Sequence, residues 1–337
     1  MAKINIRSPY FVNVTDTNLT SILLDLYVYT GTQTTDRGSV TYEINSTAYN
    51  DKVSVDISEL VRDYLDITFN GTYTSQMVWV DYQVTKFISS VAQTPDAIVA
   101  LEGFDGYGYF EDGANPQNDN ELLQSNTIDY VLEGQPYIVP VNANETVDVK
   151  FYLEGGLEST VLAPDTVESD EVILYASDTY IDEVIINDGV STTTIKVKQI
   201  DECKHTPYKI TFVNKFGALQ DIWFFKRSNL SLSVEDEKYK SNILSSGTYS
   251  INEHRNKILN KQGKESLTLN SGFVDEQYNE VFRQLMLSEK VWINYNSQTL
   301  PINISSSSLN YKTSLNDNLI NYTINTEFAF DKINNVR

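Results

Sequence analysis

Hydrophobic and polar residues alternate along most of the chain. In residues 22–29 the even positions are all aliphatic, whereas the odd positions are mixed. The same period of two recurs in residues 53–57 and 147–153. A strand that buries one face has this period, because successive side chains point to opposite sides of the sheet. The pattern therefore predicts a mainly β protein.

The predicted strands form three groups. The first comprises residues 22–29, 39–44, 53–57, 77–84 and 98–101, with a short helix over 59–64 that Ser58 is expected to cap. The second comprises residues 147–153, 172–175, 180–186 and 194–197, followed by a hairpin over 208–225 that carries Trp223, Phe224 and Phe225. The third comprises residues 266–269, 291–295, 298–304, 307–312 and 322–330.

These groups predict two or three antiparallel, β-sandwich-like domains. An N-terminal β domain is expected over residues 1–135, with a long acidic loop at 103–124. An immunoglobulin-like or fibronectin type III-like sandwich is expected over 136–230, where turn signals separate short strands. A polar segment, 226–246, precedes a C-terminal β domain over 231–337. That domain contains one helix near 274–287, in which Val274, Tyr278, Val281, Phe282 and Leu285 recur at helical spacing.

The loop 103–124 is the main candidate for a binding site. It contains four aromatic residues, Phe104, Tyr107, Tyr109 and Phe110. Such rings stack on sugars or form the centre of a protein interface. The alternative interpretation is that they hold a long loop onto its own domain.

The same loop is rich in oxygen donors of the kind that bind Ca²⁺. These are Asp105, Glu111, Asp112, Asp119 and Glu121 together with Asn115, Asn118 and Asn120. Their spacing differs from that of a twelve-residue calcium loop. A solvated acidic loop is the competing interpretation, and we assign no metal site.

Charge is distributed unevenly along the chain. The formal net charge is −21, and residues 1–200 contain nine Lys/Arg and 31 Asp/Glu. An acidic surface repels phosphate backbones and anionic lipids, so we expect no nucleic acid partner and no membrane insertion. The basic stretch His254, Arg255, Lys257, Lys261 and Lys264 is expected to meet an acidic face of a neighbouring copy rather than nucleic acid.

The residues needed for common catalytic and metal centres are scarce. The chain has one cysteine, Cys203, beside Asp201 and Glu202, which disfavour a reactive thiolate. It has two histidines, His205 and His254, without further ligands at the spacing of a zinc site. A carboxylate pair for glycoside hydrolysis cannot be singled out among 46 acidic residues. We therefore expect no enzyme activity, no catalytic residues and no cofactor.

Three segments resemble virion structural proteins of tailed bacteriophages, especially those of Bacteroidetes-type hosts. They are residues 103–113, residues 214–225 with the sequence NKFGALQDIWFF, and residues 319–336. The resemblance implies a component of the tail, baseplate or neck, which assembles with other virion proteins and with copies of itself. No functional residue is transferred from it.

The function predicted from the sequence is thus assembly of a virion, with a glycan-binding adhesion module as the alternative. The first residues lack the apolar core of a signal peptide, so we expect synthesis in the cytoplasm of a host bacterium. The near-neutral C-terminal third is expected to dock to the particle, while the acidic N-terminal part projects outward. Possible partners include a host surface glycan.

Overall fold

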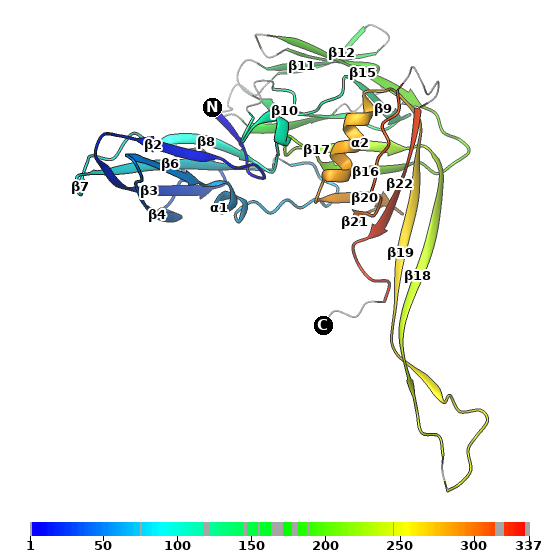
Figure 1. Cartoon of the computed structure of the whole chain (residues 1–337). Helices are drawn as coiled ribbons and strands as arrows, with labels where there is room; N and C mark the ends of the chain where they lie inside the picture. Colours follow the sequence, from blue (N-terminus) through cyan, green and yellow to red (C-terminus); the bar gives the residue numbers. More distant parts are fainter. Residues whose placement is uncertain are drawn as a thin grey trace.

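The computed structural model contains 53% strand and 6% helix, and most strand pairs are antiparallel (Figure 1). The mainly β fold class, with a helix in the C-terminal part, is therefore confirmed. The structure describes residues 2–333 except 75, 117–120, 144–146, 154–155, 163–170, 177–180, 188, 190, 245 and 314–319.

The N-terminal region is built from two sheets and a short helix. One sheet has the strand order β1-β8-β6-β3-β4, with β7 paired to β6, and the other consists of β2 and β5. The elements are β1 (Ala2–Asn5), β2 (Phe11–Thr15), β3 (Leu19–Tyr29), β4 (Tyr42–Thr47), β5 (Lys52–Asp56), α1 (Ser58–Arg62), β6 (Met77–Ile88), β7 (Val91–Ala92), β8 (Val99–Phe104) and the 3-10 turn η1 (Phe110–Asp112). The aliphatic even positions of β3 lie in the core of this region, as their alternation predicts.

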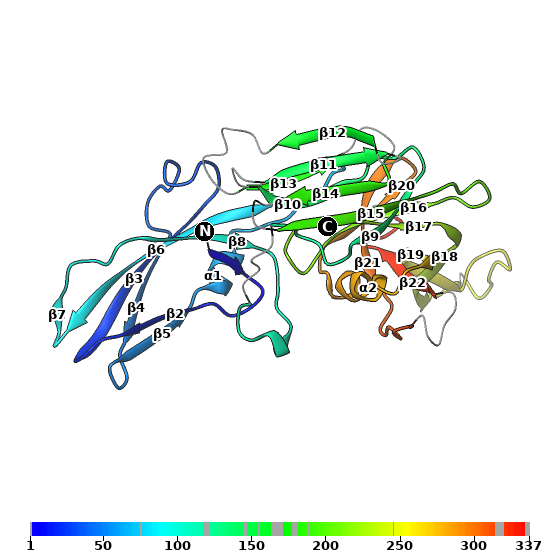
Figure 2. The same cartoon turned by 90° about the horizontal axis from the view of Figure 1, so that it is seen from above.

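The middle region contains a five-stranded sheet with the order β12-β11-β14-β15-β9 and a two-stranded sheet, β10-β13. Its strands are β9 (Ile128–Leu132), β10 (Ile138–Ala143), β11 (Asp148–Leu153), β12 (Gly156–Leu162), β13 (Glu171–Ala176), β14 (Glu183–Asn187) and β15 (Thr192–Ile200). Strands β9 and β15 are parallel, which period-two patterning cannot reveal. Figure 2 shows this region beside both others.

The C-terminal region is a seven-stranded sheet with the order β17-β16-β20-β21-β22-β19-β18. Its elements are β16 (Tyr208–Val213), β17 (Leu219–Phe224), β18 (Lys226–Lys240), β19 (Asn256–Val274), α2 (Tyr278–Leu287), β20 (Val291–Tyr295), β21 (Gln298–Ile304) and β22 (Ile320–Phe328). Helix α2 packs on the sheet through Val281, Phe282 and Leu285, which are at most 2% exposed. The sheet draws strands from both sides of residue 230, where the sequence places a domain boundary.

Several local predictions are wrong. Ser58 does not cap α1, because Ile57 occupies the N-cap position and Ser58 donates its hydroxyl to Asp56. Val274 ends strand β19, so α2 begins later than its apolar spacing predicts. No strand forms over residues 307–312, which carry no regular structure in the described part of the chain.

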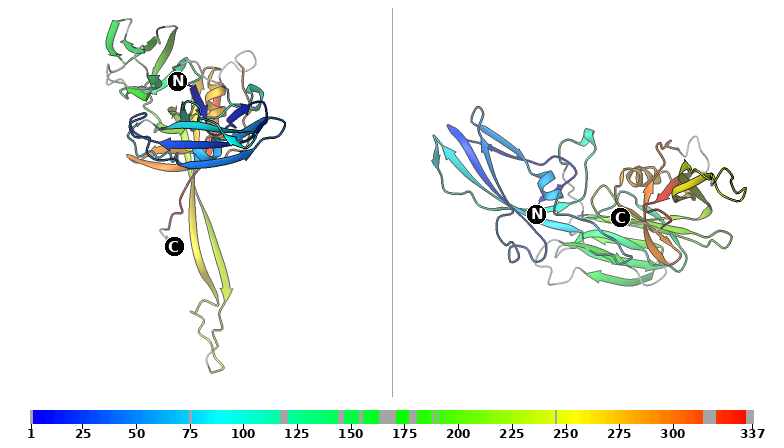
Figure 3. Two further views of the ribbon diagram at one scale, coloured as in Figure 1. Left: turned by 90° about the vertical axis from the view of Figure 1, so that its left-hand side faces the viewer. Right: turned by 90° about the horizontal axis from the view of Figure 1, so that it is seen from below.

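The largest difference concerns the polar segment 226–246. Strand β18 occupies most of it and pairs with β19 along its whole length. Together with the connecting residues the two strands form a hairpin that extends far from the rest of the molecule (Figure 1, Figure 3). We call residues 226–265 the arm.

Candidate functional site

The loop predicted as a binding site lies at the junction of the N-terminal and C-terminal regions. Phe104 is 2% exposed and packs with Leu123 and Ala218. Tyr107 is 9% exposed, and the guanidinium carbon of Arg7 lies 4.9 Å from the centre of its ring. Two of the four predicted aromatic residues therefore do not present a free ring face to solvent.

Tyr109 is held by side chains of α2. Its hydroxyl donates a hydrogen bond to Glu280 Oε1 at 2.6 Å, and the guanidinium carbon of Arg283 lies 3.5 Å from its ring centre. Lys215 Nζ lies 4.7 Å from the same ring centre. Burial, followed by the hydrogen bond to Glu280, raises the pKa of the Tyr109 phenol. Tyr109 thus ties the loop to the helix.

Phe110 is the one of the four that is fully exposed. It starts the single turn η1, in which Asp112 Oδ2 accepts a hydrogen bond from the backbone nitrogen of Tyr109. The structure brings Tyr107 and Tyr109 into edge-on contact, with ring centres 5.9 Å apart, but leaves Phe110 outside the contact. Phe110 is therefore the residue available to a ligand.

Backbone contacts explain why two glycine-containing segments meet here. Gly217 has a positive φ of 79°, and a Cβ atom at this position would lie 2.7 Å from the backbone nitrogen of Asp105. The backbone nitrogen of Tyr107 donates a hydrogen bond to the carbonyl of Lys215 at 2.8 Å. Only glycine permits this approach, because any other side chain would collide with the neighbouring chain segment.

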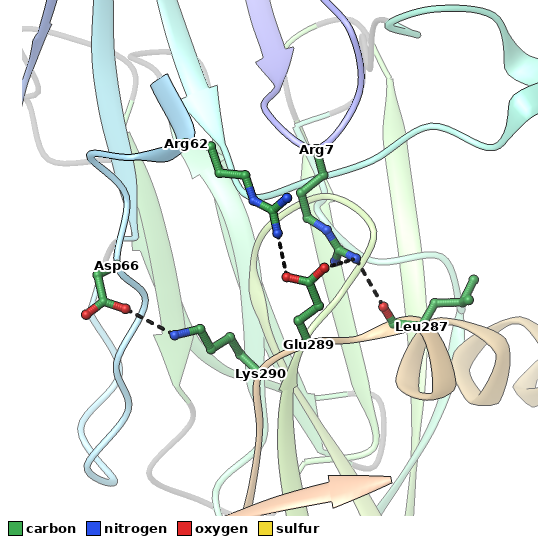
Figure 4. Close-up of polar contacts among 6 residues, drawn as sticks. All are labelled: Arg7, Arg62, Asp66, Leu287, Glu289 and Lys290. Carbon is green, nitrogen blue, oxygen red and sulfur yellow. Dashed lines mark hydrogen bonds and ion pairs between the residues drawn. The ribbon is translucent and has the colours of Figure 1, made fainter. Parts of the chain in front are cut away.

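Ion pairs reinforce the same junction (Figure 4). Arg7 and Arg62 both reach Glu289, at 3.2 Å and 2.6 Å respectively, and Lys290 lies 3.1 Å from Asp66. Arg7 also donates a hydrogen bond to the carbonyl of Leu287. The short connection between α2 and β20 is thereby tied to the N-terminal region.

A buried polar cluster lies where the middle and C-terminal regions meet. Asp129 is 4% exposed and accepts hydrogen bonds from the hydroxyls of Tyr137 and Tyr278 and from the backbone nitrogen of Tyr130. Burial raises the pKa of Asp129 to about 6, although these hydrogen bonds oppose the shift. The closed position of this carboxyl group indicates a structural role.

The other residues considered for catalysis or metal binding are the cysteine, the two histidines and the oxygen donors of the loop 103–124. Cys203 is exposed, His254 is exposed and His205 is half-buried. Asn118, Asp119 and Asn120, three of the oxygen donors of the loop 103–124, lie outside the described residues. Within the described residues, no group of three or more His, Cys, Asp or Glu side chains could hold a metal ion. In the same part of the chain, no helix has the length and apolar character needed to span a membrane.

The arm is a candidate surface that the sequence patterns did not indicate. Every residue from Asn229 to Lys240 in β18 is exposed. Large apolar side chains are nevertheless frequent along the arm, and they are 47–88% exposed: Leu230, Leu232, Val234, Tyr239, Leu244, Tyr249, Ile251, Ile258 and Leu259. The alternating sequence Leu230-Ser-Leu232-Ser-Val234 could have revealed the strand, but its polar surroundings masked it.

The arm is attached to the body through β19. Strand β22 pairs with β19 from Ser266 to Val274, and residues 256–265 of β19 pair with β18. At the base, the backbone nitrogen of Lys332 donates a hydrogen bond to the carbonyl of Gly263 at 2.7 Å. A groove of about 410 Å³ opens there, lined by Glu235, Lys264 and Glu327 among others. Beyond this base, the hairpin extends without further cover among the described residues.

Comparison with known proteins adds no family assignment. No protein-family model matches the chain, and no curated protein is significantly similar to it.

Proposed function

We propose that the protein is a structural component of a tailed-phage virion and acts by assembling with other proteins. The observation that carries this proposal is the arm, a hairpin that extends far from the body (Figure 1) and exposes apolar side chains on both of its strands. Exposed apolar surface of this extent is typical of an interaction site, because leaving it in water costs free energy.

The exposed edge of β18 and the charge of the C-terminal third also support assembly with other proteins. Strand β18 is the terminal strand of its sheet and presents unpaired backbone groups, which favour pairing with another chain. Assemblies of repeated subunits use such contacts to form rings and tubes. The arm belongs to the near-neutral C-terminal third of the chain. We expect this third to dock to the particle because it lacks the strong negative charge of the rest. The resemblance to tail, baseplate and neck proteins points to the same class.

Localisation in particles tests the proposal. An antibody raised against the full chain should label purified tailed-phage particles at a regular position, as seen by electron microscopy. Peptide mass spectrometry of those particles should find the chain in several copies. Recovery of the chain only from the soluble fraction of the lysate, with unlabelled particles, would contradict the proposal.

Glycan recognition is the second candidate, and the exposure of Phe110 favours it. A fully exposed ring next to a fixed tyrosine is a suitable surface for stacking on a sugar. A glycan array should compare the wild-type protein with Phe110→Ala and with Tyr49→Ala, a control that removes another exposed ring, between β4 and β5. Binding lost only in Phe110→Ala supports this function, whereas binding of no sugar by the wild type contradicts it.

A further inference from the structure

We infer that the arm of one molecule docks on the acidic N-terminal region, residues 1–135, of a second copy of this chain. The inference rests on the proposed assembly function and specifies one partner for it. It is carried by the direction of the arm, the chemistry of its surface and the distribution of charge over the chain.

The arm is directed away from its own N-terminal region. Figure 1 and the left view of Figure 3 both show β18 and β19 leaving the body and continuing well beyond β21 and β22. The sheet that contains β3 and β4 lies on another side of the body in these views. The exposed arm therefore cannot be covered by the N-terminal region of the same molecule in this conformation.

The arm continues the apolar face of the core into solvent. Leu230 lies opposite Leu267 in the register of β18 and β19, so both side chains are on the same face. Leu267 is 2% exposed, whereas Leu230, Leu232 and Val234 are 47–57% exposed. The same face thus changes from covered to uncovered along one hairpin, and a second molecule would complete the cover.

The outer part of the arm combines apolar side chains with unpaired cations. Tyr249 and Ile251 are 64% and 88% exposed. Lys240 and Arg255 form no ion pair within the described residues. A partner surface that offers carboxylates next to accessible apolar groups matches this combination.

Charge identifies such a surface within the same chain. The arm contains eight Lys/Arg and five Asp/Glu, while residues 1–135 contain six Lys/Arg and 19 Asp/Glu. Opposite net charges accelerate the encounter of two surfaces and orient them. The acidic remainder of the molecule disfavours nucleic acid as the occupant, because it would repel the phosphates.

The outer face of the N-terminal sheet provides a specific place for these cations. Asp25 of β3 lies directly opposite Glu43 of β4, the terminal strand of that sheet. Like charges in such a pair destabilise a sheet. Glu43 is exposed, so its carboxylate is accessible to a partner. A Lys or Arg from a second molecule would relieve this repulsion.

The contact joins two different surfaces, so each molecule retains a free arm or a free acceptor after the first contact. Such a head-to-tail interface produces a ring if the rotation closes, and a filament if it does not. Reciprocal docking of two arms would instead close a two-fold dimer, so the contact produces a dimer, a ring or a filament.

Light scattering after size-exclusion chromatography of the purified full chain tests the inference. The wild type should form dimers or larger species at low ionic strength, and high salt should dissociate them, because salt screens exposed charges. The double variant Lys240→Glu/Arg255→Glu should weaken association about tenfold or more. The control Lys196→Glu/Lys204→Glu, which makes the same charge change at exposed positions of the body, should behave as the wild type.

A charge exchange identifies the acceptor. The Glu43→Lys variant should also associate poorly, and mixing it with Lys240→Glu/Arg255→Glu should restore complexes. Unchanged thermal unfolding of each variant ensures that folding is intact. A wild-type chain that remains monomeric at the highest attainable concentration overturns the inference, as does association that the arm variant leaves unchanged.

This test is separable from that of the proposed function. A chain found in particles but monomeric in isolation would keep the virion function and end the inference. Association through the arm by a chain absent from particles would keep the inference and end the virion function.

Discussion

The two ends of strand β19 have the same kind of sequence and opposite environments. Leu267 and Leu269, near its C-terminal end, are at most 2% exposed and belong to the cluster that α2 completes. Ile258 and Leu259, near its N-terminal end, are 49% and 53% exposed. Cover from α2 and β22 makes the difference, since the backbone is a paired strand at both ends. Apolar residues in a strand therefore do not by themselves create a core.

The largest expected change in the free energy of unfolding comes from truncating a side chain of α2, the helix that covers the C-terminal end of β19. Phe282→Ala should lower the free energy of unfolding by about 3–5 kcal/mol, because it leaves a cavity between α2 and the sheet. Leu232→Ala in the arm should change it by about 0.5 kcal/mol or less. Urea unfolding followed by tryptophan fluorescence measures both. Similar losses for the two variants would contradict the contrast between covered and uncovered ends.

The pH dependence of stability that Asp129 produces tests whether water is excluded from its buried carboxyl group. Its pKa is about 6 in the folded state and 3.8 in an unfolded chain, so only the folded state keeps the proton between these values. The free energy of unfolding should therefore fall by up to about 3 kcal/mol as the pH rises from 4 to 6. Asp129→Asn should remove this part of the pH dependence. Identical pH profiles for both proteins would show that water reaches the carboxyl group.

Two glycines with similar backbone angles sharpen the comparison further. Gly217, with φ 79°, is packed against the loop backbone, whereas a Cβ atom at Gly247, with φ 81°, would meet no atom within 4 Å. Gly217→Ala should lower the free energy of unfolding by about 2 kcal/mol, because it combines backbone strain with overpacking. Gly247→Ala should strain only the backbone at the tip of the arm, with a free-energy penalty of about 1 kcal/mol. Thermal unfolding of both variants measures the difference, and equal effects would contradict the close approach at Gly217.

The smallest effect is expected at the ion pairs of the junction. Glu289 is half exposed, so its pairs with Arg7 and Arg62 are screened by solvent. Glu289→Gln should reduce the free energy of unfolding by about 0.5 kcal/mol. The loss should shrink in high salt. A loss several times larger would show that these charges, and not the buried contacts of Phe104 and Gly217, hold the two regions together.

Sequence reasoning located most strands because period-two alternation follows directly from backbone geometry. It correctly assigned the buried face of β3 and the apolar face of α2. It missed β18, because exposure of both faces lets polar residues dominate a paired strand. It also offered all four loop aromatics as contacts, whereas only Phe110 is fully exposed. Burial of Phe104 and Tyr107 depends on segments more than 100 residues away, which local patterns do not contain.

The sequence by itself determined most of the strands, the apolar faces of β3 and α2, and how charge divides along the chain. Only the tertiary structure decided which apolar faces are covered, that β9 runs parallel to β15, and that a hairpin with exposed apolar side chains extends into solvent. Alternation is a property of neighbouring residues, whereas burial of an apolar face requires that segments distant in the sequence pack against it. Beyond the base of the arm, where Lys332 contacts Gly263, no described segment of this chain covers its apolar side chains.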